Sequence, residues 1–323
     1  MTYQPHSTAS SPPIVQFARQ RAPKLVSRNQ LLDIAKEGLI HLSGTPIDQV
    51  IWVAERVDGK LRPAIATPED VQRANFESFA KRCARPAWKT EHAPTIFAGE
   101  DRSIVERFRT LRSRLYQIAA AQPLRSLLIT SSLPMEGKTF IATNLAQSFI
   151  RQTDRRVLLI DADLRASRLH LSLGAPDKPG LADYLDGHAD EFQVTQVGPE
   201  GNLCLIPGGK PTADPSGLLH SARMKQFVEK MSQVFDWVII DSPPAVAVHD
   251  ASVLAYMCDG VLLAVRAGAT DFELAEKASA EFREKNLLGV VLNQVTKDSS
   301  YGQYYYGYGQ ESGGELKKDR ERV

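Results

Sequence analysis

The fold is indicated most directly by SLLITSSLPMEGKTFIATNLAQSFI, residues 126–150, in which SSLPMEGKT joins a short apolar run to a helical pattern. A tight loop between a strand and a helix aims backbone N–H groups at an anion. In the GxxxxGK[ST] pattern the lysine reaches the β- and γ-phosphates and the hydroxyl holds Mg²⁺. The usual first glycine is Ser132 here. The predicted nucleotide-binding residues are Ser132, Met135, Glu136, Gly137, Lys138, Thr139 and Phe140.

Apolar β-branched runs and helical patterns alternate on both sides of this loop, from SIVERFRTLRSRLYQIAAA to LGVVLNQV. Apolar strands separated by helices are typical of a parallel sheet that is covered on both faces. The sequence therefore predicts an α/β P-loop domain, doubly wound and mostly parallel, over residues 99–297. Ligands of such sheets bind at the carboxyl ends of the strands.

Two further strand ends carry acidic residues. RVLLIDADL ends in Asp161 and Asp163, and FDWVIIDSPP contains Asp241. A turn or cap explains one aspartate of the first pair but not both, because unpaired carboxylates at a buried strand end need a cation or a donor. Asp241 is where a carboxylate that binds Mg²⁺ is expected. We predict catalytic roles for Lys138, Asp161, Asp163 and Asp241, with Thr139 and Asp241 at the metal; the residues alone do not decide which of Asp161 and Asp163 joins them there.

Composition limits the remaining possibilities. The 323 residues carry a formal net charge of +1 with interspersed signs, which gives no nucleic-acid signal. The 3 cysteines form no CxxC pair, which favours a reducing cytoplasm. No apolar run reaches the roughly 18 to 20 residues of a membrane span, and no secretory signal is evident. We therefore expect a cytoplasmic protein, or one that is associated with a membrane only through a partner.

The segments outside the α/β domain differ in character. Residues 1–30 are predicted to be a disordered basic arm, and residues 31–98 a small α+β appendage followed by a linker. Within 31–98 we expect a strand in QVIWVAERV, a helix in PEDVQRANFESFAKRC and the linker in KRCARPAWKTEHAPT. Residues 298–323 form a predicted flexible tail. Its Gly/Tyr/Gln composition is typical of low complexity, and it holds Tyr301, Tyr304, Tyr305, Tyr306 and Tyr308.

Over residues 99–310 the motifs resemble those of the bacterial tyrosine kinases called BY-kinases, which work with polysaccharide co-polymerases. SSLPMEGKT resembles their Walker A loop, VLLIDADLR their Walker A′ motif, and IIDSPP with VHDA their Walker B region. The resemblance implies ATP and Mg²⁺ as cofactors and protein tyrosine as substrate. It also implies that Asp161 accepts the phenolic proton while Asp163 and Asp241 attend the metal.

Two more matches concern assembly. ERFRTLR places Glu106, Arg109 and Arg112 on one broad polar face of a helix, where an internal ion pair on a solvated surface is the simpler explanation. The resemblance implies instead that this motif joins neighbouring subunits of a homo-oligomeric ring. It further implies that a neighbour phosphorylates the five tail tyrosines. It implies as well that a separate membrane co-polymerase activates the kinase, unless the N-terminal appendage has taken over some of that role.

The pattern departs from the family at Met135, where glycine is common and a positive φ would strain any other residue. Two alternatives stay open. A partitioning-type switch ATPase would carry a second lysine early in the loop, where this chain has Leu133, and would lack the tyrosine tail. A nucleotide-binding pseudo-kinase scaffold is supported only by Met135 and Ser132.

Overall fold

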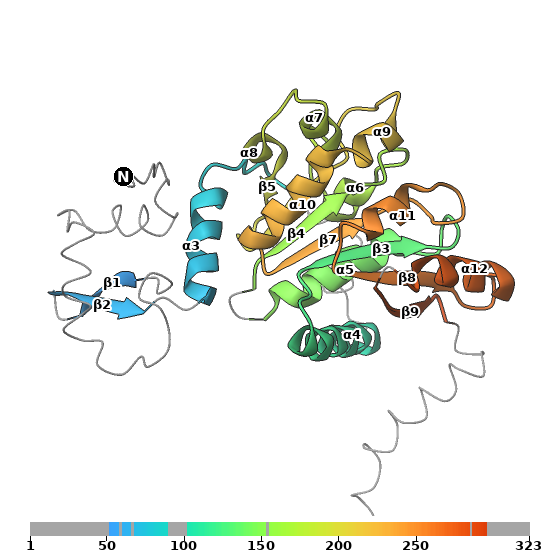
Figure 1. Ribbon diagram of the computed structural model, residues 1–323, viewed down its shortest axis with the longest axis horizontal. Coiled ribbons are helices and arrows are strands. Elements are labelled where there is room, and N and C mark those ends of the chain that lie inside the picture. The colour runs from blue at the N-terminus through green and yellow to red at the C-terminus, as the bar shows by residue number, and fades with distance from the viewer. Residues whose placement is uncertain are drawn as a thin grey trace, which may run out of the picture.

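The centre of the molecule is a seven-stranded sheet in the order β5-β6-β4-β7-β3-β8-β9 (Figure 1). The computed structural model describes residues 52–57, 60–65, 68–89, 102–152, 155–284 and 286–295. The strands of this sheet are β3 (Ser126–Ser131), β4 (Val157–Asp161), β5 (Gln196–Val197), β6 (Leu203–Ile206), β7 (Trp237–Asp241), β8 (Gly260–Arg266) and β9 (Leu287–Asn293). Every neighbouring pair is parallel except β5 with β6. The predicted doubly wound, mostly parallel α/β fold is confirmed.

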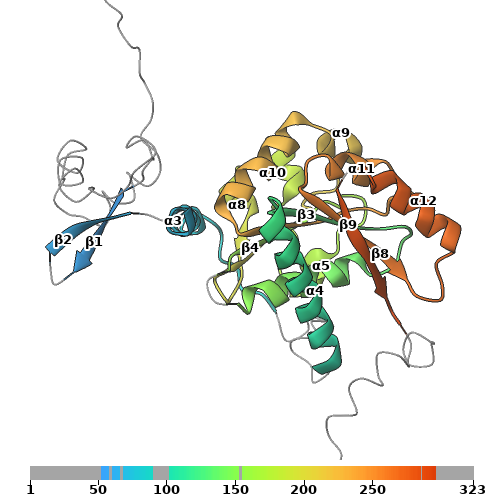
Figure 2. The ribbon, with the colours of Figure 1, turned by 60° about the horizontal axis from the view of Figure 1, so that its bottom comes forward.

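Most strand residues are apolar because helices cover both faces of the sheet, and alternate side chains enter different cores. Leu158 and Ile160 of β4 belong to one core, whereas Leu159 belongs to the other. Figures 1 and 2 show α4 and α10 on opposite sides of the sheet. The longer helices are α4 (Arg102–Ala121), α5 (Lys138–Ile150), α10 (Ala222–Val234), α11 (Asp250–Ala255) and α12 (Phe272–Phe282). The shorter ones are α6 (Leu169–Leu173), α7 (Leu181–Leu185), α8 (Glu191–Val194) and α9 (Pro215–Leu219).

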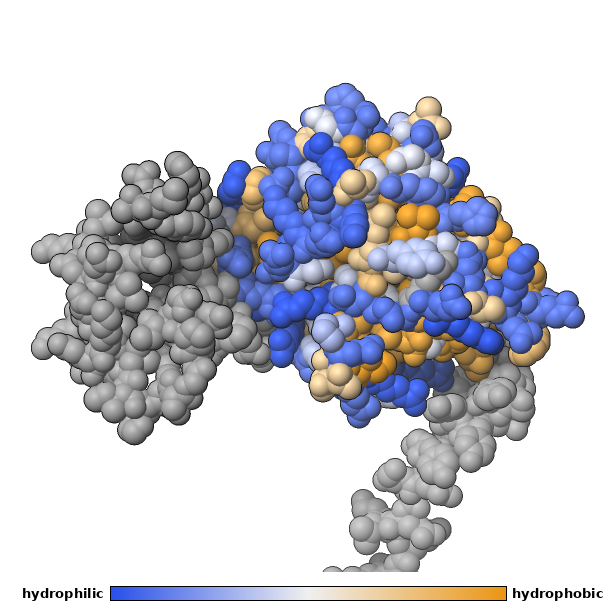
Figure 3. Space-filling model, in the orientation of Figure 1, coloured by the Kyte–Doolittle hydropathy of each residue, from blue (hydrophilic) through white to orange (hydrophobic). Residues whose placement is uncertain are grey.

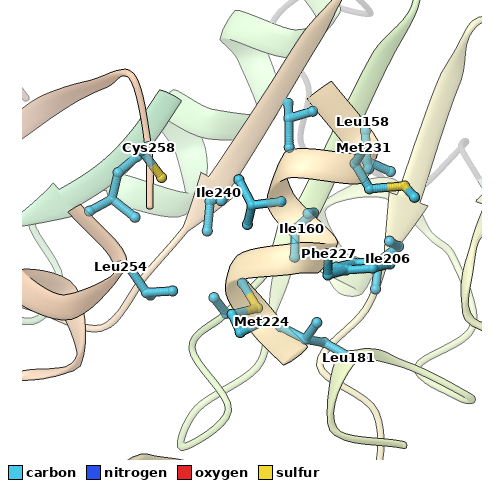
Figure 4. Packing of buried hydrophobic residues seen from close by; sticks show 14 of the residues in the cluster. Leu158, Ile160, Leu181, Ile206, Met224, Phe227, Met231, Ile240, Leu254 and Cys258 are labelled. Atoms are coloured by element: carbon cyan, nitrogen blue, oxygen red, sulfur yellow. The ribbon is translucent and has the colours of Figure 1, made fainter. Parts of the chain in front are cut away.

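Figure 4 shows the core beneath α10. The helix directs Met224, Phe227 and Met231 at Leu158, Ile160 and Ile206 of the sheet. All six side chains are buried. The spacing of the three helix residues follows the helical period, so they form one buried face of α10.

The surface of the α/β domain in Figure 3 is covered mainly by hydrophilic side chains, with apolar groups interspersed. None of the helices in the described ranges is both long and apolar enough to cross a membrane. Cys83, Cys204 and Cys258 are free and buried.

Part of the N-terminal region packs onto this domain. β1 (Trp52–Val57) and β2 (Lys60–Ile65) form an antiparallel pair, of which the sequence predicted the first strand, and α3 (Pro68–Ala80) follows. Gln72 Nε2 of α3 donates to the Phe235 carbonyl at 2.6 Å. Phe76 and Phe79 pack edge-on against the Phe235 ring, with centroids 5.4 and 5.7 Å away. Since these rings are buried in the core shared with α10, α3 is packed as part of the α/β domain.

Residues 81–89, called the strap here, differ from the expected linker. Ala84 pairs with Gln196 of β5, the edge strand of the sheet, and its carbonyl accepts from Val197 N at 2.9 Å. Trp88 is buried in the core on the α5 side. The strap is packed rather than a free linker because Trp88 is buried in the core and Ala84 pairs with the edge strand. The sequence alone did not predict either contact, because both join residues that are far apart in the chain. The rest of the expected linker, the basic arm and the tail lie outside the described residues, and the division into domains stays a prediction.

Candidate active site

The phosphate loop lies between β3 and α5, and its shape depends on two residues. Gly137 precedes the helix with φ 94°, and a Cβ there would lie 2.0 Å from Asn293 Nδ2, so both the backbone and the space require glycine. Glu136 is buried, and its Oε2 accepts from Leu133 N at 2.8 Å across the loop. The first N–H groups of α5 remain available for an anion, as at any helix N-terminus.

Residues at the carboxyl ends of β8 and β9 hold this loop by hydrogen bonds. Thr270 Oγ1 donates to Glu136 Oε1, and Asn293 Nδ2 donates to the Glu136 carbonyl at 2.9 Å. Gln294 Nε2 donates to the Met135 carbonyl at 3.4 Å. Sequence reasoning missed these contacts. Their only signal was the polar pair Asn293 and Gln294 at the end of the apolar run of β9.

The predicted catalytic residues converge at the carboxyl ends of β3, β4 and β7. Lys138 Nζ forms an ion pair with Asp163 Oδ2 at 2.9 Å. Thr139 Oγ1 donates to Asp241 Oδ2 at 2.6 Å. Strand register places Asp161 directly opposite Asp241. Residues far apart in sequence therefore meet because parallel neighbouring strands end at the same edge.

Asp161 organises the loop that follows β4. Its Oδ2 accepts from Ser167 Oγ at 2.7 Å, Arg168 N at 3.0 Å and Leu169 N at 2.9 Å. Its Oδ1 accepts only from Asp163 N in the described structure, at 3.2 Å. The carboxylate is 0% exposed, so these donors compensate the cost of its burial. Ser167 is a further residue that sequence reasoning missed, because nothing in DADLRAS marks it as a hydrogen-bond donor to Asp161.

The acidic cluster shifts protonation equilibria. Burial raises the pKa of Asp161, against hydrogen bonds that lower it. Burial also raises the pKa of Asp241 to about 7, with Lys138 opposing the shift and Asp161 adding to it. For Lys138, burial alone would lower the pKa, but Asp241 and Asp163 outweigh it, and the net pKa is raised. The lysine therefore stays cationic among the carboxylates.

The site contains unpartnered polar atoms that suit a cation and a phosphate. Within the described part of the chain, Asp241 Oδ1 and Ser132 Oγ are buried without a hydrogen-bond partner. A buried carboxylate oxygen beside a threonine hydroxyl fits Mg²⁺, which binds proteins through one or two carboxylates and substrate phosphates. Ser132 Oγ lies in the phosphate loop itself. The residues present thus fit a nucleotide with its metal.

The comparisons with known proteins agree with this geometry. Residues 135–316 match the CobQ/CobB/MinD/ParA nucleotide binding domain. The tyrosine-protein kinase YwqD of Bacillus subtilis is 35% identical over 206 residues, which cover 62% of this chain and 86% of that protein. The tyrosine-protein kinase CpsD of Streptococcus agalactiae is 36% identical, covering 61% of this chain and 83% of that protein. This chain belongs to the bacterial tyrosine-protein kinases.

Solved structures place the likeness in the kinase domain. The kinase domain of Escherichia coli tyrosine kinase ETK is 35% identical with a TM-score of 0.57, covering 61% of this chain and 77% of that one. The chimerical protein CapA2B2 is 26% identical with a TM-score of 0.59, covering 69% of this chain and all of that one. The chain spans only 30% of the length of the tyrosine-protein kinase wzc of Salmonella typhimurium. The BY-kinase resemblance is confirmed.

In this family member the side chains of the ExxRxxR motif do not share one environment. Arg109 Nη1 pairs with Glu106 Oε1 at 2.5 Å on the surface, and both side chains are exposed. Arg112 instead turns toward α5, where its Nη1 donates to the Ser148 carbonyl at 2.5 Å. The long Arg112 side chain therefore reaches the end of the neighbouring helix, and the interface role of all three residues stays a prediction.

Arg165 also has a definite environment. Its Nε lies 3.1 Å from Asp250 Oδ2, and its Nη2 donates to Ser216 Oγ at 2.7 Å. Asp250 is buried. These contacts connect the kinase's A′ loop to α9 and α11. The five tail tyrosines that the sequence predicts to be phosphorylated lie outside the described residues.

Proposed function

We propose that the chain is an ATP-dependent protein-tyrosine autokinase that phosphorylates the C-terminal tyrosine cluster of neighbouring subunits and regulates polymerisation and export of an exopolysaccharide or capsule. The observation that carries the proposal is the meeting of Lys138, Thr139 and three aspartates at one phosphate loop. The relatives named tyrosine-protein kinases favour phosphoryl transfer to protein over a partitioning-type switch.

The loop would hold the nucleotide as follows. Backbone N–H groups at the start of α5 bind the phosphates. Lys138 has three N–H donors, of which one meets Asp163, so two remain for phosphate oxygens. Thr139, Asp163 and Asp241 are the residues that would hold Mg²⁺, which neutralises charge on the transferred phosphoryl group when bound.

Asp161 would act as the base for the acceptor tyrosine. A phenol has a pKa near 10, so its proton must leave as the oxygen attacks. Of the two carboxylate oxygens, Oδ1 accepts a single long bond and is the better placed to take that proton. The phenolic oxygen then bonds to the γ-phosphorus, the bond to the β,γ-bridging oxygen breaks, and ADP leaves.

The tail is suited to be the substrate. β9 ends at Asn293, which contacts the phosphate loop, and Tyr301 follows seven residues after Gln294. Seven extended residues reach about 24 Å, so the first tyrosine of each tail begins close to a nucleotide site. Each phosphotyrosine adds about −1.5 to −2 charge, and five add roughly −8 to −10. Such charge would disperse a ring of otherwise nearly neutral subunits.

Assembly and location complete the proposal. Glu106, Arg109 and Arg112 would join subunits into a homo-oligomeric ring, and the exposed Glu106–Arg109 pair is available for such a contact. The ring would be cytoplasmic and peripheral to the inner membrane, held there by a separate polysaccharide co-polymerase that activates it.

The test is intact-mass spectrometry of phosphatase-treated protein after incubation with Mg²⁺ and ATP. We expect several steps of about 80 Da, confined to chains with the tail and absent from Lys138→Met and from a chain ending at Lys297. Phosphate release from ATP without any mass step would support the switch ATPase instead. Nucleotide binding with neither product, even with a co-polymerase segment added, would support a pseudo-kinase scaffold.

A further inference from the structure

The strap meets the helix that follows the A′ loop. Lys89 N donates to the Gly174 carbonyl at 2.7 Å, directly after α6. A Cβ on Gly174 would lie 2.2 Å from the Lys89 carbonyl oxygen, so the two backbones touch. Gly174 also has φ 67°, which already favours glycine. The close approach therefore depends on this glycine.

Trp88 anchors the strap beside the same helix. Its side chain is 9% exposed and belongs to the core that contains Leu169 and Leu173, the first and last residues of α6. The indole also covers Gly198, where a Cβ would lie 2.9 Å from its ring atoms. The Trp88 side chain thus packs over the residue that follows the edge strand, in the same core that Leu169 and Leu173 of α6 enter.

The other end of α6 holds the proposed catalytic base. Leu169 N donates to Asp161 Oδ2, next to the bonds from Arg168 N and Ser167 Oγ. α6 has only five residues, too few to be stable without packing. Its position, and with it the position of its first N–H groups, must come from the residues that pack on it.

We propose that Trp88 is a positioning residue for phosphoryl transfer, and that the strap fixes α6 so that Asp161 is held in its catalytic orientation. The inference rests on the proposed kinase function. It connects the N-terminal region to the site through α6, from Lys89 at one end to Asp161 at the other. A displaced α6 leaves the phosphate loop intact but lets the Asp161 carboxylate turn.

The experiment compares full-length Trp88→Ala, Trp88→Phe and Gly174→Ala with Gly201→Ala. Gly201 also has a positive φ, but a Cβ there meets nothing within 4 Å, so this control carries the backbone strain without displacing the strap. We expect Trp88→Ala and Gly174→Ala to lower kcat for tail phosphorylation about tenfold or more. The Kd for Mg-ADP should change less than about twofold. Trp88→Phe should restore most of the rate.

Amide hydrogen exchange of residues 161–173 gives a readout that does not need activity. We expect faster exchange at Leu169 in Trp88→Ala and Gly174→Ala, and no change in Gly201→Ala. Unchanged exchange, or a fall in kcat no larger than that of Gly201→Ala, would overturn the inference. If the wild-type chain transfers no phosphate, the kinase proposal fails, while the exchange data still decide whether the strap holds α6.

Discussion

Met135 holds a left-handed backbone conformation, with φ 65°, although it carries a Cβ. That conformation costs a residue other than glycine roughly 1 to 2 kcal/mol. The side chain is 83% exposed and offsets little of this by packing. The strain lies in the phosphate loop, whose carbonyl at this position accepts from Gln294. The sequence therefore identified the strained residue, and the loop holds a positive φ there in spite of the Cβ.

Met135→Gly should stabilise the protein by up to about 1 kcal/mol, because relief of strain exceeds the extra entropy of the unfolded chain. ATP affinity should be kept, since the loop already has this conformation. Thermal unfolding and ATP titration measure the two quantities. Asn286→Gly is the matched control, with φ 58° outside the loop, and should gain less because asparagine tolerates this region. A loss of stability in Met135→Gly would show that the thioether contributes contacts.

The residues of the site were predictable from sequence to different degrees. Lys138, Thr139 and Asp241 follow from a strand, a loop and a helix start, which are local features. The clamp on Glu136 was not predictable, because Thr270 and Asn293 approach it only when β8 and β9 take the sheet edge. The inward turn of Arg112 was equally hidden, since helical spacing fixes where a side chain starts but not where a long one ends.

Helix α4 therefore has two kinds of arginine. Arg112 donates a charged hydrogen bond to the last turn of α5, whereas Arg109 forms an exposed pair within its own helix. Arg112→Ala should lower the free energy of unfolding by about 1.5 to 3 kcal/mol. Arg109→Ala should cost less than about 1 kcal/mol. Thermal denaturation tests this contrast.

The same two variants separate folding from assembly. If Arg109 joins subunits, Arg109→Ala should reduce the mass seen by light scattering while its melting temperature stays near that of the wild type. Equal masses for Arg109→Ala and wild type would contradict the proposed ring contact. Arg112→Ala alone cannot make this distinction, because its loss also loosens α4 from α5.

Helix α3 illustrates how a whole element can be predicted without its role. The start at Pro68 followed by acids identified the helix, but nothing in the sequence showed that Phe79 meets Phe235 and Phe192. The residues that form these contacts are more than 100 positions apart in the sequence, so no local pattern reveals them. We expect Phe79→Ala to destabilise the α/β domain by about 3 kcal/mol. Phe272→Ala is the control, because this side chain is 78% exposed and its removal should cost no more than about 0.5 kcal/mol. Equal effects in urea denaturation would mean that α3 contributes little to the domain.

At the scale of the whole molecule, the tail begins beside the phosphate loop of its own subunit, so its tyrosines could be phosphorylated by their own site or by that of a neighbour. A short tether gives each tail a high effective concentration at its own site, so transfer within one subunit is open geometrically. Transfer between subunits requires assembly. The rate should then rise with protein concentration and fall in Arg109→Ala.

We expect transfer between subunits. It can be detected by mixing two variants, neither of which can phosphorylate itself. The full-length Lys138→Met chain keeps the tail but lacks the phosphate-binding lysine, and a chain ending at Lys297 keeps the site but lacks the tyrosines. Incubated together with Mg²⁺ and ATP, they should give steps of about 80 Da on the Lys138→Met chain, which stays unmodified by itself. Two results together would mean that each site uses its own tail. The Lys138→Met chain would stay unmodified in the mixture, and the phosphorylation rate of the wild-type chain would not depend on its concentration. The exposed Glu106–Arg109 pair would then need another explanation, because no contact between subunits would be required for the reaction.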